Sequence, residues 1–281
     1  MWMVVCNCLF VEKVRSLEAF ALALLDKELF VLTQSSPKLR VCDTAFNLRG
    51  SVVIPMVSSP CSFVDIVACS FHYCLYIADA RSKCIFRLEM PSKCKKWEVE
   101  GLNSDAVVTV THKRHLLILC GTVTYRKLTL FSTVGVLLNT VKLHPSFHSV
   151  TSAVELTPGQ YVITQGRHDD DFHRVRVIDS AGKILHMFGG FRGSLPTLLD
   201  SPSDVAVDKD GFVYVDDEKN DRLIVLTQEL DYIHCMQRIF TKSKGDVRRR
   251  MKLDKQLGLF YVRHMQKWGD TCTYYTTLYK I

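Results

Sequence analysis

A short apolar segment with the alternating composition of a β-strand recurs along this chain at a nearly constant spacing. Six copies can be aligned, and their corresponding residues lie between 41 and 52 positions apart. They occupy residues 29–32, 75–78, 116–119, 161–164, 213–216 and 260–263. The blades of β-propellers repeat about every 40 to 50 residues. The repeat therefore favours a closed ring of small sheets over a β-sandwich, which does not require equal repeats.

The copy with the clearest strand boundaries reads SPSDVAVDKDGFVYVDDEKNDRLIVL and spans residues 201–226. Its first two alternating runs are separated by Lys-Asp-Gly, which has the length and composition of a hairpin turn. A third run follows at 222–226 and a fourth at 232–236. The segment therefore predicts a four-stranded antiparallel meander, which is one blade.

The complete pattern predicts an all-β fold, a six-bladed β-propeller formed by residues 1–281 as a single domain. The first strand of each copy is expected to line the central channel. The blades are expected near residues 16–55, 60–100, 104–143, 150–189, 201–237 and 248–281. The sixth copy reaches residue 281 directly after its third strand, so we expect a closing strand within residues 1–10, at 2–6, to complete the last blade.

Composition excludes several other classes of protein. With 47% hydrophobic and 23% charged residues, the chain has the average balance of a globular protein. Its eleven cysteines are scattered and form no C-x-x-C pair, so zinc-ribbon, RING and thioredoxin-type sites are not expected. The N-terminal apolar window lacks the features of a signal peptide and is too short to span a bilayer. We therefore expect a reduced, cytoplasmic setting and no membrane partner.

One stretch resembles a known repeat family. The residues Val-Ala-Val-Asp208, Gly211, Val-Tyr-Val215, Asp217, Asn220 and Arg222 resemble the NHL repeat. The second copy keeps the aspartate as Asp79, but serine and cysteine stand at the places of the Asn and Arg. The resemblance covers nearly the whole chain by period, and one blade and part of another by motif. It implies an NHL-like propeller.

Six motif residues are expected to hold the blades together. They are Asp79, Asp208, Gly211, Asp217, Asn220 and Arg222. Short Asx side chains hydrogen-bond nearby backbone groups in turns, so a structural role within the loops is the expectation for the acids and the Asn.

NHL propellers often form the C-terminal part of tripartite-motif (TRIM) proteins, in which they bind RNA or proteins for a ubiquitin ligase. This chain has no RING or B-box cysteine–histidine pattern and no heptad run, so ligase chemistry is not expected in it. The resemblance implies a recognition domain, as in the substrate-recognition part of a TRIM-like ligase system.

Enzymatic activity is not expected, although some related propellers are enzymes. Amidating lyases hold a metal with histidines near the channel, and lactonase-like propellers use Glu, Asn and Asp. None of the predicted inner strands contains a histidine, and most histidines, His173 among them, fall in predicted loops. There is no G-x-S-x-G elbow and no phosphate loop. A channel-centred, metal-dependent lyase or lactonase stays a remote alternative, and no metal or cofactor is expected.

The topology of a propeller predicts which residues share a face. Loops between second and third strands, and links between blades, lie on one side, and they carry basic and aromatic residues. The expected partner-binding residues are Lys242, Lys244, Arg248, Arg249, Arg250, Tyr125, Arg126, Lys127, Arg167, Phe172, Phe191, Arg192, Lys267 and Trp268.

Two kinds of partner suit such a face. Basic and aromatic side chains together bind single-stranded RNA, and Trp, Tyr and Arg also dominate protein-binding hot spots. The acidic runs at 169–171 and 216–218 lie on the same predicted face and would repel a phosphate chain. A protein partner is therefore the first expectation, single-stranded RNA is the alternative, and DNA is not expected.

Overall fold

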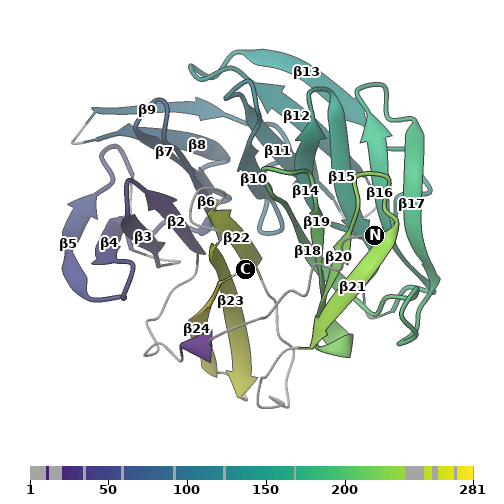
Figure 1. The fold of residues 1–281 in the computed structure, drawn as a ribbon. Helices are drawn as coiled ribbons and strands as arrows, with labels where there is room; N and C mark the ends of the chain where they lie inside the picture. Colours follow the sequence, from purple (N-terminus) through teal and green to yellow (C-terminus); the bar gives the residue numbers. More distant parts are fainter. Residues whose placement is uncertain are drawn as a thin grey trace.

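The structure is a computed structural model that describes residues 11–12, 21–33, 36–57, 60–90, 93–122, 125–167, 169–237, 250–254, 259–268 and 271–280. The described part of the chain is all-β, apart from one turn of 3-10 helix at Glu218–Asn220. Its strands form four-stranded sheets whose neighbouring strands are antiparallel, and the sheets are arranged around a ring (Figure 1). The protein is a β-propeller of four-stranded antiparallel blades.

Five blades are each built from four strands that are consecutive in sequence. Blade 1 contains β2 (Ala21–Leu25), β3 (Glu28–Leu32), β4 (Lys38–Asp43) and β5 (Leu48–Val53). Blade 2 contains β6 (Phe63–Cys69), β7 (Cys74–Asp79), β8 (Cys84–Glu89) and β9 (Lys93–Glu98). Blade 3 contains β10 (Val107–Val110), β11 (Leu116–Gly121), β12 (Arg126–Phe131) and β13 (Leu137–Lys142). Blade 4 contains β14 (Val150–Thr157), β15 (Gln160–Gln165), β16 (Phe172–Asp179) and β17 (Ile184–Phe191). Blade 5 contains β18 (Pro202–Val207), β19 (Val213–Asp217), β20 (Arg222–Leu226) and β21 (Tyr232–Gln237).

The remaining sheet joins the two ends of the described chain. It contains β22 (Arg250–Asp254), β23 (Leu259–Trp268), β24 (Thr271–Lys280) and the two-residue strand β1 (Val11–Glu12), in the order β1-β24-β23-β22. Of the described N-terminal residues, Val11 and Glu12 pair with β24, opposite Tyr279 and Leu278. The predicted closing strand at 2–6 lies outside the described residues, and the strand beside β24 begins later in the chain.

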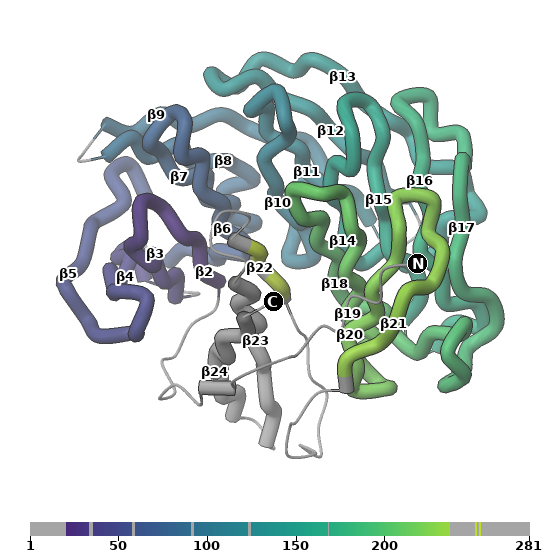
Figure 2. The backbone as a smooth tube through the Cα atoms, viewed as in Figure 1, coloured from purple at the N-terminus to yellow at the C-terminus, as the bar shows by residue number. Residues whose placement is uncertain are grey.

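The structure thus shows five blades of consecutive strands, where six blades were predicted, the last one closed by an N-terminal strand. The last copy does not form such a blade of its own, because its segment supplies three strands and the described N-terminal residues add only the two-residue pairing of β1. Its inner strand β22 contacts β18 of blade 5 and β2 of blade 1, so this sheet lies between them in the ring. Figure 2 follows the chain from blade 1 around to blade 5.

The core is divided among the interfaces between blades. Phe30 of blade 1 and Phe63 of blade 2 are buried in one apolar cluster, and Tyr76 and Ile118 are buried in the next, between blades 2 and 3. Side chains of a strand alternate between the two faces of its sheet, and both faces of a blade are covered by neighbours. The second strands are therefore apolar on both faces, and every residue of β7 is buried. Burial of this apolar surface is the main stabilising contribution.

Buried carboxylates join the inner strands across blade boundaries. Asp65 of β6 accepts a hydrogen bond from the backbone N–H of Val108 in β10, at 2.8 Å. Asp204 of β18 accepts one from Met251 in β22, at 2.7 Å, and another from the hydroxyl of Ser152 in β14. Backbone N–H groups buried without a partner are costly, and these carboxylates satisfy them.

Among the described residues, no helix combines the length and the hydropathy that a membrane span requires.

Candidate functional site

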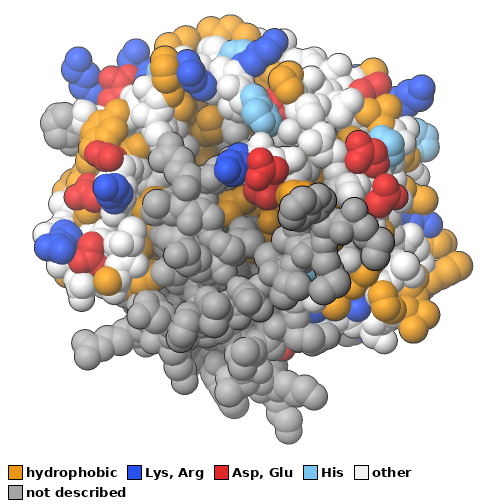
Figure 3. Space-filling model, viewed as in Figure 1, with side chains coloured by type: hydrophobic (Ala, Val, Ile, Leu, Met, Phe, Trp, Pro, Cys, Tyr) orange, Lys and Arg blue, Asp and Glu red, His pale blue; other side chains and the backbone are white. Residues whose placement is uncertain are grey.

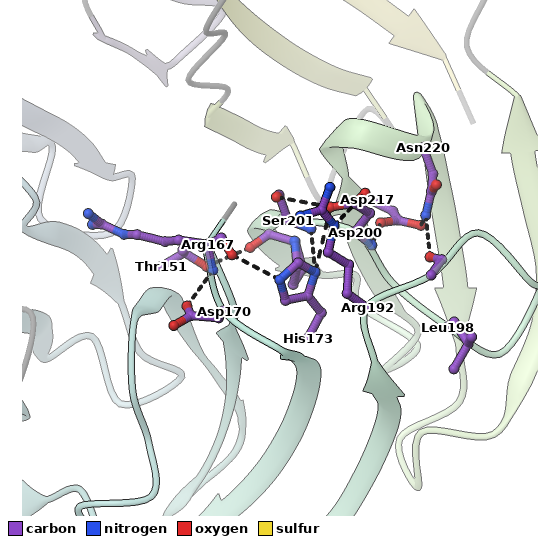
Figure 4. Close-up of polar contacts among 12 residues, drawn as sticks. Thr151, Arg167, Asp170, His173, Arg192, Leu198, Asp200, Ser201, Asp217 and Asn220 are labelled. Atoms are coloured by element: carbon purple, nitrogen blue, oxygen red, sulfur yellow. Dashed lines mark hydrogen bonds and ion pairs between the residues drawn. The ribbon is translucent and has the colours of Figure 1, made fainter.

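Blade 5 contains a buried polar network around one carboxylate. Asp217, at the end of β19, accepts hydrogen bonds from the N–H of Asp200 at 2.6 Å and from Asn220 Nδ2 at 2.8 Å (Figure 4). It accepts a third from Arg222 Nε, at 2.7 Å. Burial raises the pKa of Asp217, against the effect of these three donors. The Arg222 guanidinium also donates to the carbonyl of Leu198, at 2.6 Å. The network therefore fixes the link 193–200 onto blade 5.

Blade 2 carries a reduced version of the same network. Asp79, at the end of β7, accepts hydrogen bonds from the N–H of Ser62 at 2.7 Å and from the hydroxyl of Ser82 at 2.7 Å. Cys84 lies opposite Asp79 in the strand register, as Arg222 lies opposite Asp217. The carboxylate alone thus holds the preceding link, since the cysteine supplies no guanidinium.

Asp208 and Gly211 shape the β18–β19 turn. The Asp208 carboxylate accepts the N–H groups of Asp210 and Phe212, each at 2.9 Å, and the hydroxyl of Tyr214 at 3.0 Å. Gly211 has a φ of +88°, and a Cβ there would lie 2.0 Å from the side chain of Gln228. Both residues are therefore engaged in the turn itself.

His173 is buried within blade 4 and does not lie in a loop, which corrects the expectation from sequence. Its Nδ1 accepts the N–H of Ser201 at 2.8 Å, so the ring proton lies on Nε2, which donates to the carbonyl of Arg167 at 2.9 Å (Figure 4). A Cβ on Gly166, whose φ is +118°, would lie 2.3 Å from this ring. The neutral histidine thus joins the β15–β16 loop to the link that enters blade 5.

The predicted basic residues of blades 3 and 4 are largely neutralised. Arg126 is only 3% exposed, and it and Arg167 both bond the carboxylate of Asp105, at 3.4 and 2.7 Å. Lys127 Nζ lies 2.8 Å from the carboxylate of Glu100, and this contact lowers the pKa of Glu100. Arg126 was predicted to contact a partner and is instead a buried structural residue, because its guanidinium binds the link that precedes β10.

A basic groove lies between blades 3 and 4. It has a volume of about 510 Å³ and a floor that includes the buried side chains of Leu143 and Phe147. Its lining comprises Tyr125, Arg126, Lys142, Leu143, His144, Pro145, Phe147, Ala181, Gly182 and Lys183. None of the described residues that line it carries a carboxylate, and the two lysines are exposed.

A buried cation lies directly beneath the basic groove. The guanidinium of Arg176, in β16, lies 4.6 Å from the centre of the Phe147 ring and donates to Gln165. Burial, with the nearby Arg174, lowers the pKa of Arg176 to about 10. At neutral pH Arg176 is therefore charged, and its field is poorly screened because the side chain is 3% exposed. It adds positive potential to a groove that already carries two lysines.

An acidic pocket of about 440 Å³ lies on blade 4, where the β15–β16 loop meets the end of β17. Asp169, Asp170, Asp171, Phe191 and Arg192 line it. Arg192 Nε lies 3.2 Å from the carboxylate of Asp200, which compensates its charge. The three aspartates therefore give the pocket an excess of negative charge.

An aromatic pair borders the acidic pocket. The rings of Phe172 and Phe191 lie 4.8 Å apart, and Phe191 is 67% exposed. Arg174 covers the Phe172 ring at 4.1 Å. Hydrophobic side chains gather on the surface at the lower right of Figure 3, where β16 and β17 lie in Figure 1.

A chain of polar contacts connects the lining of the groove to the lining of the pocket. Arg126, in the groove lining, contacts Asp105, and Asp105 contacts Arg167. The N–H of Arg167 in turn donates to Asp170 of the pocket, at 2.7 Å. We call this surface, made of the basic groove, the acidic pocket and the aromatic pair, the loop face.

The structure brings only part of the predicted set together. Tyr125, Arg126, Lys127, Arg167, Phe172, Phe191 and Arg192 lie on or beneath the loop face. Lys242, Lys244, Arg248 and Arg249 lie outside the described residues, and for Arg250, Lys267 and Trp268 the structure describes only the backbone. Lys267 and Trp268 were expected in a loop and lie in strand β23, paired with Cys272 and Thr271.

Sequence reasoning missed two residues of the groove. Lys142 ends an outer strand and Lys183 lies in the turn between β16 and β17, which was assigned to the opposite face. The strong twist of the blades brings the two together, and no local sequence signal reports that twist.

Comparisons with known proteins support the fold. No model of a protein family matches the chain, and no curated protein matches it either. Among solved structures, a streptogramin B lyase has 9% sequence identity and a TM-score of 0.62, over 95% of this chain and 85% of that one. A protein of unknown function from Bacteroides caccae has 12% identity and a TM-score of 0.60, over 85% and 83%.

A third match is the Cps50 (Swd1) β-propeller domain of Myceliophteria thermophila, with 10% identity and a TM-score of 0.56 over 93% of this chain and 83% of that one. Identities this low show a shared propeller fold and nothing finer.

Proposed function

We propose that this chain is a non-catalytic recognition domain that binds a protein partner through the loop face. The observation that carries the proposal is the division of that face into a basic groove and an acidic pocket beside an exposed aromatic pair. Protein interfaces combine aromatic anchors with charges of complementary sign. A partner with an acidic, partly apolar segment for the groove and a basic segment for the pocket fits this arrangement.

RNA is less well supported as the partner. Arg126, Arg167 and Arg192 each contact a carboxylate, so their charges are already compensated. The Asp169–Asp171 run would face a phosphate chain that crossed blade 4, and like-charge contacts weaken the electrostatic driving force of RNA binding. The lysines of the groove are too few to offset this.

Two finer proposals concern the family. We propose that the sheet of β22, β23, β24 and β1 acts as a sixth blade, since β22 contacts blades 5 and 1. We also propose an NHL-type propeller, supported by the network of Asp217, Asn220 and Arg222. On that basis the domain would select substrates for a TRIM-like ubiquitin ligase.

The described cysteines are free thiols, which is consistent with the cytoplasmic setting that we propose.

A catalytic role has less support. The likeness to streptogramin B lyase rests on 9% identity, which carries the fold alone. The inner strands of the five blades and β22 contain no histidine. The buried carboxylates of Asp65 and Asp204 are engaged by backbone N–H groups of neighbouring strands.

The test uses three labelled probes: an acidic peptide with a central tryptophan, its lysine-rich counterpart and a mixed-sequence single-stranded RNA. Fluorescence polarisation should show binding of the acidic peptide, weakened at least about tenfold by Lys142→Glu with Lys183→Glu. The matched control, Lys93→Glu with Lys95→Glu, changes exposed lysines of β9 and should have little effect. Tighter binding of RNA than of the acidic peptide would overturn the proposal.

A further inference from the structure

Two cysteines lie directly opposite each other at the hairpin that joins β6 and β7. Cys69 ends β6, Cys74 begins β7, and the two are partners in the strand register. Both side chains are buried in the same cluster between blades 2 and 3, so both point to the same face of the sheet. Directly opposed residues of antiparallel strands have Cβ atoms about 4.5 to 5.5 Å apart. A disulfide needs about 3.5 to 4.5 Å, so a small approach of the two strands would join them.

The surroundings of the pair favour one thiolate. A hydrogen bond from the thiol of Cys74 lowers the pKa of Cys69, with a further contribution from His72. The same contact raises the pKa of Cys74, whose sulfur also contacts Arg87. The other ionisable neighbours are Tyr76, whose pKa is raised by burial, and Glu89, which is 2.7 Å from Arg87. The contact therefore favours ionisation of Cys69 over that of Cys74, which makes Cys69 the better nucleophile of the pair.

Four other described cysteines differ from this pair. Burial raises the pKa of Cys42, Cys61, Cys94 and Cys120. A buried neutral thiol reacts slowly, because the thiolate is the reactive species. Reactivity is thus expected to be concentrated at Cys69.

The turn that covers the pair is exposed. Phe71 and Tyr73, in the four-residue turn between the cysteines, are 64% and 47% exposed. The guanidinium of Arg114, in the β10–β11 turn of blade 3, lies 3.1 Å from the centre of the Phe71 ring. A change in the conformation of this hairpin would therefore alter its contact with the neighbouring blade.

We propose that Cys69 and Cys74 are a reversible oxidation site that hydrogen peroxide converts into a cross-strand disulfide. The Cys69 thiolate attacks one peroxide oxygen, an S–O bond forms, the O–O bond breaks, and hydroxide leaves and takes up a proton to become water. The Cys74 sulfur then attacks the sulfenic acid, the S–S bond forms, the S–O bond breaks, and a second water leaves. The two sulfurs lose two electrons and the peroxide gains them. A dithiol reductant restores the thiols.

The test uses the intact folded chain. Peroxide treatment, alkylation of the remaining thiols and tryptic mass spectrometry should show that the peptide containing residues 69–74 has lost two hydrogens and is not alkylated at these positions. Oxidation of Cys69 should be at least about tenfold faster than that of Cys94. Dithiothreitol should reverse the change.

Variants separate the two steps. Cys74→Ser should leave a sulfenic acid at Cys69 that dimedone traps, whereas Cys69→Ser should abolish the disulfide, and Cys94→Ser is the matched control that leaves it intact. If a serine variant does not fold, the measurement on the natural sequence still decides. Equal alkylation of Cys69 and Cys74 before and after peroxide would overturn the proposal, as would a disulfide that joins either of them to another cysteine.

Discussion

The carboxylate of Asp204 and the backbone N–H of Met251 lie 2.7 Å apart and join blade 5 to the sheet of the chain ends. The same carboxylate accepts the N–H of Val205 at 2.9 Å and the hydroxyl of Ser152, so one side chain connects the inner strands of three neighbouring sheets. An equivalent contact from Asp65 to Val108 joins blades 2 and 3. Closure of the ring therefore depends on buried polar contacts as well as on apolar packing.

Replacement of this carboxylate should destabilise the ring. In Asp204→Ala the donors of Met251 and Ser152 lose their acceptor in a buried site, which costs about 2 to 4 kcal/mol of unfolding free energy. Urea denaturation followed by tryptophan fluorescence measures the loss. Asp210→Ala, in an exposed turn, is the control and should change stability by less than about 0.5 kcal/mol. Equal stabilities of the two variants would contradict the role assigned to Asp204.

Substitution of two glycines with positive φ distinguishes the cost of backbone strain from the cost of a steric clash. Gly166→Ala places a methyl group 2.3 Å from the His173 ring, whereas a Cβ on Gly159, whose φ is +84°, meets nothing within 4 Å. Gly159→Ala should cost about 1 kcal/mol from backbone strain alone, and Gly166→Ala about 3 kcal/mol or more. Thermal denaturation of both variants checks the order, and the reverse order would show that His173 does not occupy the space described.

Arg126 should matter for stability and not directly for binding. Its guanidinium is buried against Asp105, so Arg126→Ala should lower the unfolding free energy by about 2 to 4 kcal/mol. At a temperature at which the variant is folded, its affinity for the acidic peptide should stay within about threefold of the natural sequence. Lys142→Glu should show the opposite pattern, with weaker binding and unchanged stability.

The pKa of Glu100 offers a pH-dependent test. The hydrogen bond from Lys127 lowers the pKa of Glu100 in the folded state. A carboxyl group whose pKa is lower in the folded than in the unfolded state stabilises the fold at a pH above the ordinary carboxyl range. This stabilisation is lost as the pH falls through the folded-state pKa. An NMR titration of Glu100 should therefore show a depressed midpoint that returns to the ordinary value in Lys127→Met. Lys142→Met should leave the midpoint depressed, and a normal midpoint in the natural sequence would disprove the ion pair in solution.

The parts of the fold that could be predicted from sequence are those in which strands and turns have a local sequence pattern. The run at 201–226 has apolar alternation and turn residues at fixed places, and the structure forms β18, β19 and β20 within it. Repetition of that pattern extended the prediction to the other blades. The last sheet could not be predicted as well, because β1 is two residues long and pairs with a strand at the far end of the chain. Such a long-range pairing leaves no local periodicity.

The loop face was predicted from basic and aromatic residues in loops on one side of the ring. Tyr125, Phe172 and Phe191, which were expected in such loops, lie beside or at the ends of β12, β16 and β17. Whether an arginine is available depends on its neighbours, and Arg126 and Arg167 share Asp105, a residue of a different link. Lys142 and Lys183 became neighbours only through the twist of two sheets.

The sequence by itself determined the all-β class, the repeating blade and the turns, because strand alternation and turn chemistry act between residues that are close along the chain. Tertiary structure alone decided which N-terminal residues pair with β24 and which charges are compensated. These properties depend on contacts between residues tens of positions apart, such as Asp204 with Met251, and their energies arise only when burial removes water from both partners.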